Sequence, residues 1–232
     1  DIQVRLRDLG LSLVLFNAEP GHWAGGDRGL ASLEGREADF RRSIQEALAR
    51  AQALDCPLVH VMAGLCTAPT DVPAAWARYE QRLAWAAEQA RTHDRVLTIE
   101  PINPRDIPSY FLNHQAEAHA VRAAVCAATG LNNLKVQMDL YHCQIVEGDL
   151  STKISQYLPT GRVGHFQFAD VPPRHEPGSG ELNWDHLFAL IDRIIERLGD
   201  AVASEILVPP GDDAAAWIPA GGAIVATADA MT

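Results

Sequence analysis

The sequence predicts an α/β protein of the (β/α)8 barrel type in which about six of the eight βα units are visible. Short apolar segments rich in Val, Ile and Leu alternate along the 232 residues with longer segments that have the spacing of amphipathic helices. Near-continuous apolar strands joined through helices indicate a parallel sheet covered on both faces. An open doubly wound sheet fits the same alternation, but it usually carries a Gly-rich turn after its first strand. Neither GxGxxG nor a P-loop occurs, so a barrel is favoured.

The elements follow one another in a regular order. Strands are expected over residues 11–17, 57–64, 95–101, 134–140, 162–170 and 201–208. Amphipathic helices are expected over residues 37–54, 74–93, 113–129 and 183–199, and residues 1–10 have the pattern of a helix that leads into the first visible strand. We therefore expect a barrel domain over residues 1–208 that lacks its first βα units, followed by an irregular Gly-, Pro- and Ala-rich tail over residues 209–232.

Composition excludes several classes of partner. The formal net charge of -11 opposes a nucleic-acid groove, because no Lys/Arg cluster is available to neutralise phosphates. No run approaches the roughly 20 apolar residues that cross a bilayer, and the first residues lack the zones of a signal peptide. The cytoplasm is the default compartment, and the spacing of the four cysteines fits neither a paired thiol motif nor a disulfide framework. We expect a small-molecule substrate, and the sequence leaves a homo-oligomer open.

Polar residues end four of the expected strands, at the barrel edge where chemistry takes place. They are Glu100, Asp139, Gln167 and Glu205. Three carboxylates that converge on one mouth could not all stay ionised without compensation, so a divalent cation is expected among them. The all-oxygen ligand set favours Mg²⁺ or Mn²⁺. For any single one of these residues, the alternative is a strand-end group satisfied by a helix N-terminus or by solvent.

Histidines near these positions have two readings. His142 follows Asp139 by three positions, a spacing that allows the loop to turn the imidazole back over a metal, although an ordinary loop histidine fits equally well. His60 and His165 lie inside expected strands, where they could bond to backbone in the core or line the mouth.

Three long segments carry a resemblance to a known family. LTIEPINPRDIPSYFLN, KVQMDLYHCQIVEGDL and GHFQFADVPPRHEPGSGELNW resemble the hydroxypyruvate isomerases of the xylose isomerase-like TIM-barrel superfamily, and the likeness runs from the first visible strand to about residue 205. It implies two further strands before that one. It also implies a divalent metal held by Glu100, Asp139, Gln167 and Glu205, with the two glutamates as the acid/base pair. The residues after Glu205 depart from the family's aromatic and basic pair before proline.

The resemblance implies a reaction and a set of substrate contacts. Hydroxypyruvate and tartronate semialdehyde would be interconverted by proton transfer through an enediolate. His142 matches a substrate-binding histidine of related epimerases, and Arg174 and His175 fall in the family's RHEP loop. Arg174 is the first candidate to bind the substrate carboxylate, because a guanidinium offers two parallel hydrogen bonds.

A second pair of candidates lies beyond Glu100. Arg105 is the second candidate for the substrate carboxylate, and Asp106 lies where related epimerases carry a carboxylate near substrate. For the two arginines the alternative is a surface salt bridge, with Asp106 or Glu176. Asp106 could instead cap the turn before Pro108.

Other functions remain open at this level. The same barrel could serve a 2-oxo-tetronate isomerase or a ketose 3-epimerase. Metal-dependent phosphodiester hydrolysis, as in barrel endonucleases of the superfamily, needs several zinc ions, more histidine ligands and a basic groove, and the net charge opposes it. An inactive, truncated relative is the remaining alternative.

Overall fold

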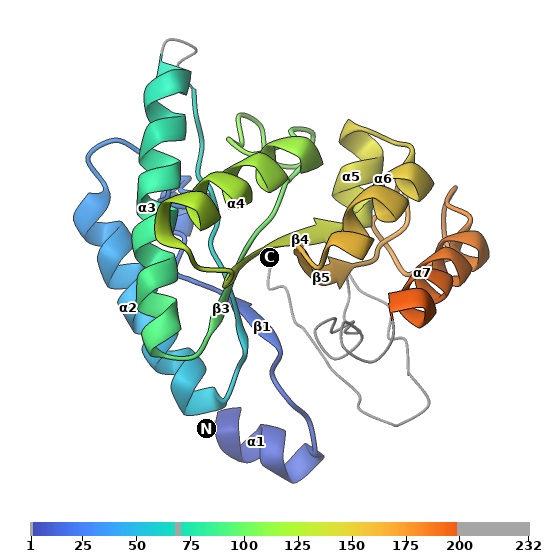
Figure 1. Cartoon of the computed structure of the whole chain (residues 1–232), viewed down its shortest axis with the longest axis horizontal. Helices are drawn as coiled ribbons and strands as arrows, with labels where there is room; N and C mark the ends of the chain where they lie inside the picture. The colour runs from blue at the N-terminus through green and yellow to red at the C-terminus, as the bar shows by residue number, and fades with distance from the viewer. Residues whose placement is uncertain (1, 68–70, 199–232) are drawn as a thin grey trace. The chain divides into compact units, whose positions relative to one another are not determined.

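The computed structural model describes residues 2–67 and 71–198 (Figure 1). Over that range strands and helices alternate as expected, and none of the helices combines the length and the apolar character that crossing a membrane requires. The described residues divide into two compact units: one comprises Leu15–Val136, and the other holds residues 2–14 and 137–198. The expected strand over residues 201–208, Glu205 within it, and the tail lie outside the described residues.

Parallel strands form the centre of the Leu15–Val136 unit. They are β1 (Leu15–Asn17), β2 (Leu58–His60), β3 (Val96–Ile99) and the first half of β4 (Leu134–Asp139). Each pairs in parallel with the next in sequence, in a register that places Asn17 opposite His60 and Ile99 opposite Val136. All four lie within the runs that the sequence predicts. This order is the one that successive βα units generate.

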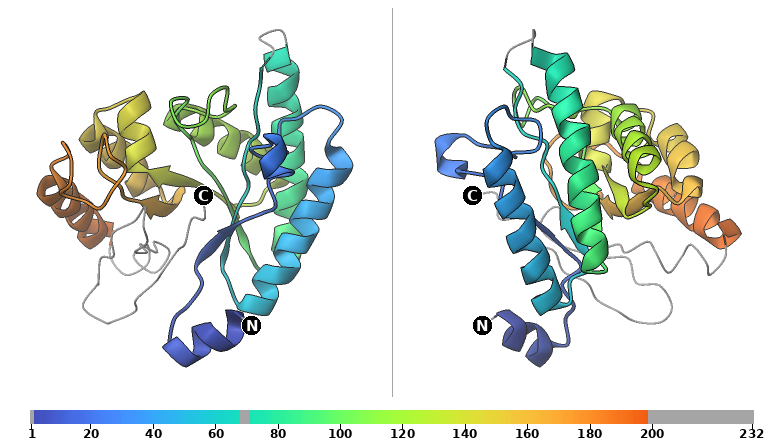
Figure 2. Two further views of the ribbon diagram at one scale, coloured as in Figure 1. Left: turned by 180° about the vertical axis from the view of Figure 1, so that it is seen from behind. Right: turned by 60° about the vertical axis from the view of Figure 1, so that its left-hand side comes forward.

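Three long helices accompany these strands, the first two packed directly on the sheet and the third packed on the second. They are α2 (Glu37–Leu54), α3 (Val72–Thr92) and α4 (Gln115–Thr129). Helices α2 and α3 lie side by side, with α2 against β2 and α3 against β3 (Figure 2). Helix α4 begins with a capping box between His114 and Glu117 and ends at Gly130, whose φ of +70° suits glycine. A short 3-10 helix, η1 (Trp23–Gly25), lies in the loop after β1.

The second unit holds α1 (Ile2–Leu9), the end of β4, and β5 (Val163–Gln167), which follows β4 in the sheet order. Between the two strands lie α5 (Leu140–Val146), α6 (Leu150–Tyr157) and the 3-10 helix η3 (Leu158–Thr160). Helix α7 (Trp184–Leu198) follows β5. The helical pattern of residues 1–10 is thus confirmed. The core of this unit includes the buried side chains of Met138, Leu140, Ile154, Phe166, Phe168, Trp184 and Ile191.

Candidate active site

Polar residues occupy the carboxyl ends of the described strands, among them the predicted Glu100, Asp139 and Gln167. Asn17, His60, Asp139 and Gln167 are the last residues of β1, β2, β4 and β5, and Glu100 directly follows β3. Apart from Asn17, all of these side chains are buried. Carboxyl ends of parallel strands are where barrel enzymes carry their chemistry.

Glu100 lies beside a histidine from the neighbouring strand. Its carboxylate is almost fully buried, with Oε2 3.7 Å from Nε2 of His60. The other ring nitrogen of His60, Nδ1, is 2.9 Å from Oδ1 of Asn17. The imidazole is therefore held between two side chains and faces Glu100. Of the two readings of His60, this geometry favours the one in which it lines the strand ends.

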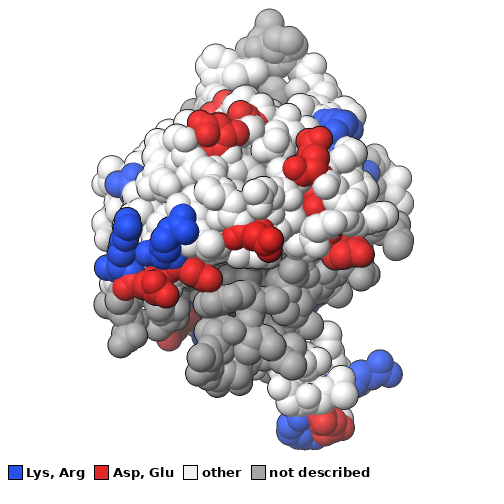
Figure 3. Space-filling view, turned by 90° about the vertical axis from the view of Figure 1, so that its right-hand side faces the viewer, with Lys and Arg blue, Asp and Glu red and all other residues white. Residues whose placement is uncertain are grey.

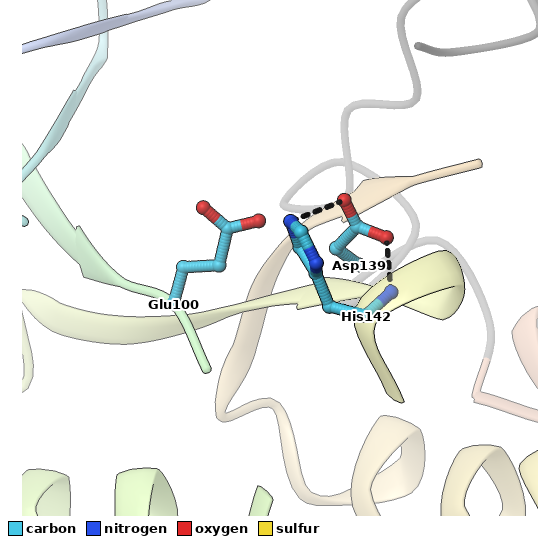
Figure 4. A group of neighbouring side chains, drawn as sticks. All are labelled: Glu100, Asp139 and His142. Atoms are coloured by element: carbon cyan, nitrogen blue, oxygen red, sulfur yellow. Dashed lines mark hydrogen bonds and ion pairs between the residues drawn. The ribbon is translucent and has the colours of Figure 1, made fainter. Parts of the chain in front are cut away.

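Asp139 and His142 form a close pair (Figure 4). Oδ1 of Asp139 accepts a hydrogen bond from the backbone N–H of His142 at 3.0 Å, which caps the first turn of α5. Oδ2 of the same carboxylate lies 3.6 Å from Nε2 of the imidazole, and both side chains are only 2% exposed. The helix-capping alternative is thus real for one oxygen of Asp139, while the other oxygen faces the histidine.

Gln167 is also engaged by a neighbour. Its Oε1 atom, the atom that the resemblance assigns to a metal, accepts a hydrogen bond from Nε2 of Gln137 at 2.6 Å, and both amides are buried. An amide oxygen has two lone pairs, so this bond leaves one for a further ligand. Gln137 lies two residues before Asp139 on β4, and because side chains alternate along a strand, it shares the strand face of Asp139.

Arg174 lies next to His142. One terminal nitrogen of its guanidinium is 3.4 Å from Nε2 of His142, and its Cζ atom lies 5.0 Å from the ring centre of Tyr141, within the range of a cation–π contact. Two residues that the sequence predicts as substrate ligands are therefore together. His175, the next residue, is exposed, and its backbone oxygen accepts a hydrogen bond from the backbone N–H of Asp170.

The other predicted pair makes local contacts. Nε of Arg105 lies 3.7 Å from Oδ1 of Asp106, and the arginine side chain is about half exposed (48%). Asp106 also contacts Asn103, which donates from Nδ2 to Oδ2 at 3.2 Å and accepts from the backbone N–H of Asp106 at 2.8 Å. The salt bridge with Asp106, which the sequence offers as the alternative role of Arg105, is therefore present.

Two residues of this region were missed from the sequence. Asn17, which orients His60, ends the first apolar run in the same way as the predicted site residues end theirs. Asp170 ends the run over residues 162–170, and the structure places its carboxylate in a fully buried position where it accepts several hydrogen bonds. Its position as an acidic residue at the end of an apolar run could have identified Asp170 from the sequence.

Comparisons with known proteins agree with this architecture. The family model described as "Xylose isomerase-like TIM barrel" matches residues 1–195. The 2-oxo-tetronate isomerase of Cupriavidus necator is 48% identical over 194 residues, which cover 84% of this chain and 72% of that protein. The hydroxypyruvate isomerase of Escherichia coli K12 is 37% identical over 182 residues, or 78% of this chain and 68% of that protein. A crystal structure titled "AP endonuclease, family 2 from Brucella melitensis" is 39% identical, with a TM-score of 0.76, over 83% of this chain and 72% of that one.

Proposed function

Because the chain belongs to the xylose isomerase-like TIM barrel family, we propose that it interconverts hydroxypyruvate and tartronate semialdehyde with the assistance of a divalent cation. Its curated relatives are isomerases, and isomerase is the enzyme class of this chain. The expectation of a (β/α)8 barrel type is confirmed by the family and by the parallel strands.

The strand register is the observation that carries the proposal. Ile99 pairs with Val136, so Glu100 follows directly on one strand while the neighbouring strand continues to Asp139. Both carboxylates are buried, and His142 adds a buried imidazole (Figure 4). Buried ionised carboxylates are costly unless a positive charge balances them, and this set offers the donor types of a metal centre.

The proposed ligands are those expected from the sequence. Glu100, Asp139, Gln167 and Glu205 would hold the cation, with Glu205 supplied from beyond the described residues. Carboxylate and amide oxygens are the ligands that Mg²⁺ and Mn²⁺ accept readily, so we propose one of these two ions.

The reaction moves a carbonyl group between adjacent carbons. The carbon that bears the hydroxyl loses a proton, the carbonyl carbon gains one, and the two oxygens exchange roles through an enediolate. A bound dication would act as a Lewis acid that stabilises negative charge on these oxygens. In the proposed mechanism Glu100 and Glu205 act as base and acid, each contributing about 10² to 10⁴-fold in rate.

The remaining predicted residues would bind the substrate. We propose that His142 contacts a substrate oxygen and that Arg174 binds the carboxylate through two parallel hydrogen bonds. The 3.4 Å approach of the two side chains supports these roles, because it brings a carboxylate-binding group next to an oxygen-binding one. Arg105 is a weaker candidate for the carboxylate, since its guanidinium already lies beside Asp106.

A second candidate substrate has a specific observation in its favour. The relative from Cupriavidus necator that is 48% identical is named a 2-oxo-tetronate isomerase. The same proton transfer would then act on a four-carbon acid. The ratio of kcat/KM for the two acids decides between them.

Phosphodiester hydrolysis is the alternative from another class. One similar structure carries an endonuclease title. The net charge of -11 opposes this function, and on the face drawn in Figure 3 the basic side chains lie beside acidic ones instead of forming a stripe along which a phosphate backbone could bind.

Solvent exchange tests the proposal directly. Deuterium uptake into hydroxypyruvate in D₂O is followed by NMR for the parent chain, Glu100→Gln and Glu205→Gln, with Mn²⁺ present. We expect each substitution to slow exchange at least 10²-fold, because a glutamine cannot accept the proton. The exposed α3 substitution Glu88→Gln is the matched control and leaves the rate unchanged. Exchange at the parental rate in both glutamate variants ends the proposal.

A further inference from the structure

A buried carboxylate ties together the loop that follows β5. Asp170 is fully buried, and both of its carboxylate oxygens accept hydrogen bonds. Oδ1 accepts from the backbone N–H groups of Val171 (2.8 Å) and Leu182 (3.1 Å). Oδ2 accepts from the backbone N–H of Gly178 (2.9 Å) and from the indole Nε1–H of Trp184 (2.9 Å). One side chain thus joins the beginning, the middle and the end of the segment.

The segment over residues 170–184, here named the Arg174 loop, also closes through the backbone of Asp170. The N–H of Asp170 donates to the backbone oxygen of His175 at 2.8 Å, and its C=O accepts from the N–H of Arg174 at 2.9 Å. Arg174 lies at φ +56°, in the left-handed region that is unfavourable for a residue with a side chain. Such a conformation persists where the surroundings hold it, and the two hydrogen bonds bracket this residue.

The loop passes the carboxylate too closely for any residue but glycine at position 180. A Cβ atom on Gly180 would lie 2.6 Å from Oδ1 of Asp170 and closer still to the backbone oxygen of Val171. Backbone atoms cannot yield as the end of a flexible side chain does. Gly180 of the GSG sequence therefore serves the close approach to Asp170.

The charge on Asp170 is stabilised by these contacts. Burial raises the pKa of its carboxyl group, but hydrogen bonds from the backbone of Leu182 and Gly180 and from the Trp184 indole outweigh it, so the pKa lies below its ordinary value. An ionised carboxylate only accepts hydrogen bonds, which matches the donors that surround it.

We propose that Asp170 is a positioning residue for substrate recognition: it closes the Arg174 loop and thereby fixes the guanidinium beside His142. The observation behind this is that the buried carboxylate of Asp170 accepts backbone hydrogen bonds from residues before and after Arg174 in the loop. The side chain of Arg174 in turn reaches 3.4 Å from the imidazole of His142. The inference rests on the proposed role of Arg174 in binding the substrate carboxylate. Because Asp170 is fully buried, we assign it no contact with the substrate.

The test uses a ligand that does not react. Glycerate carries the carboxylate and hydroxyls of the proposed substrates but no carbonyl, so its Kd, measured by calorimetry with Mn²⁺ present, reports binding without turnover. Asp170→Asn leaves one acceptor oxygen and turns an amide N–H₂ towards N–H donors. We expect the glycerate Kd and the KM for hydroxypyruvate to rise about tenfold or more, while kcat changes less than threefold.

A double variant separates positioning from general damage. If Asp170 acts through Arg174, then Asp170→Asn combined with Arg174→Lys should bind glycerate no more weakly than Arg174→Lys alone. Ser179→Ala is the control on the same loop, because it removes only the exposed hydrogen bond to the backbone oxygen of Glu176 and should leave Kd unchanged. Should Asp170→Asn fail to fold, Trp184→Phe removes one of the donors and is expected to give a smaller increase in Kd.

Each result has a distinct meaning. An unchanged Kd in folded Asp170→Asn overturns the inference, as do fully additive effects in the double variant or a parent chain that binds no glycerate. A parent that binds glycerate and shows the expected pattern, yet isomerises neither candidate acid, refutes the proposed reaction and leaves the positioning role standing.

Discussion

The carboxylate of Asp139 contacts His142 twice, through a backbone hydrogen bond of 3.0 Å to Oδ1 and a 3.6 Å approach of Nε2 to Oδ2. Capping and charge can be separated, because asparagine caps a helix as well as aspartate does but carries no charge. Without metal, we expect the free energy of unfolding of Asp139→Asn to lie within about 0.5 kcal/mol of that of the parent. The rise in Tm produced by Mn²⁺ should shrink strongly, since that rise depends on the ratio of metal concentration to Kd.

Urea unfolding without metal measures the effect of the substitution on stability. Thermal melts over a Mn²⁺ series measure its effect on metal binding. Asp149→Asn is the matched control, because Asp149 precedes α6 and is exposed. It should keep the full metal response. A Mn²⁺-dependent rise in Asp139→Asn equal to that of the parent would remove this residue from the proposed metal centre.

Arg174 and Arg105 differ in what surrounds them, and this difference predicts different responses to lysine. The guanidinium of Arg174 lies beside His142, whereas that of Arg105 lies beside Asp106 and is half exposed. We expect Arg174→Lys to raise the KM for hydroxypyruvate about tenfold with a smaller effect on kcat, because an ammonium group cannot make two parallel hydrogen bonds. Arg105→Lys should change KM less than twofold. Steady-state kinetics that show the reverse order would identify Arg105 as the carboxylate-binding residue.

Local patterns account for much of the fold. The helix expected over residues 37–54 is found as Glu37–Leu54, because its first turn is acidic and its buried side chains recur at helical spacing. The expected strand ends at Glu100, Asp139 and Gln167 are also found, since a polar residue that closes an apolar run marks the place where the strand leaves the core.

Two kinds of feature could not be predicted: a short helix without a periodic pattern, and contacts between distant segments. Helix α5 is only seven residues long and largely apolar, so it has no polar face for a periodic pattern to reveal, and its start depends on the cap from Asp139. The environment of Asp170 depends on a loop that folds back from Gly178 to Trp184. The contact of His60 with Asn17 depends on the pairing of β1 with β2.

Burial predicts which cysteines resist modification. Burial raises the pKa of the Cys56 thiol to about 11 and that of Cys143 to about 12, so at pH 8 their thiolate fractions are about one in a thousand or less. Cys66 and Cys126 are half-buried. We expect a thiol reagent such as DTNB to modify Cys66 and Cys126 in the native protein and all four cysteines in denaturant, with the sites mapped by mass spectrometry. Rapid native labelling of Cys143 would contradict the packing of α5.

Asp170 predicts how stability depends on acid. Its folded-state pKa lies below its ordinary value of about 3.9, so as pH falls the unfolded chain takes up the proton first. The stabilisation from this carboxylate is therefore fully present above about pH 5 and is lost as pH falls through 4 towards the folded-state pKa. Asp170→Asn should cost about 2 kcal/mol at pH 7, and the difference from the parent should narrow below pH 4.

Urea unfolding at pH 7, 5, 4 and 3.5 measures this difference. Ser179→Ala serves as the comparison, because it removes a hydrogen bond from the same loop without removing an ionisable group. Its difference from the parent should stay constant over the same range. If the difference for Asp170→Asn is also constant down to pH 3.5, the hydrogen bonds to Asp170 do not favour its ionised form, and the predicted loss of stability in acid is wrong.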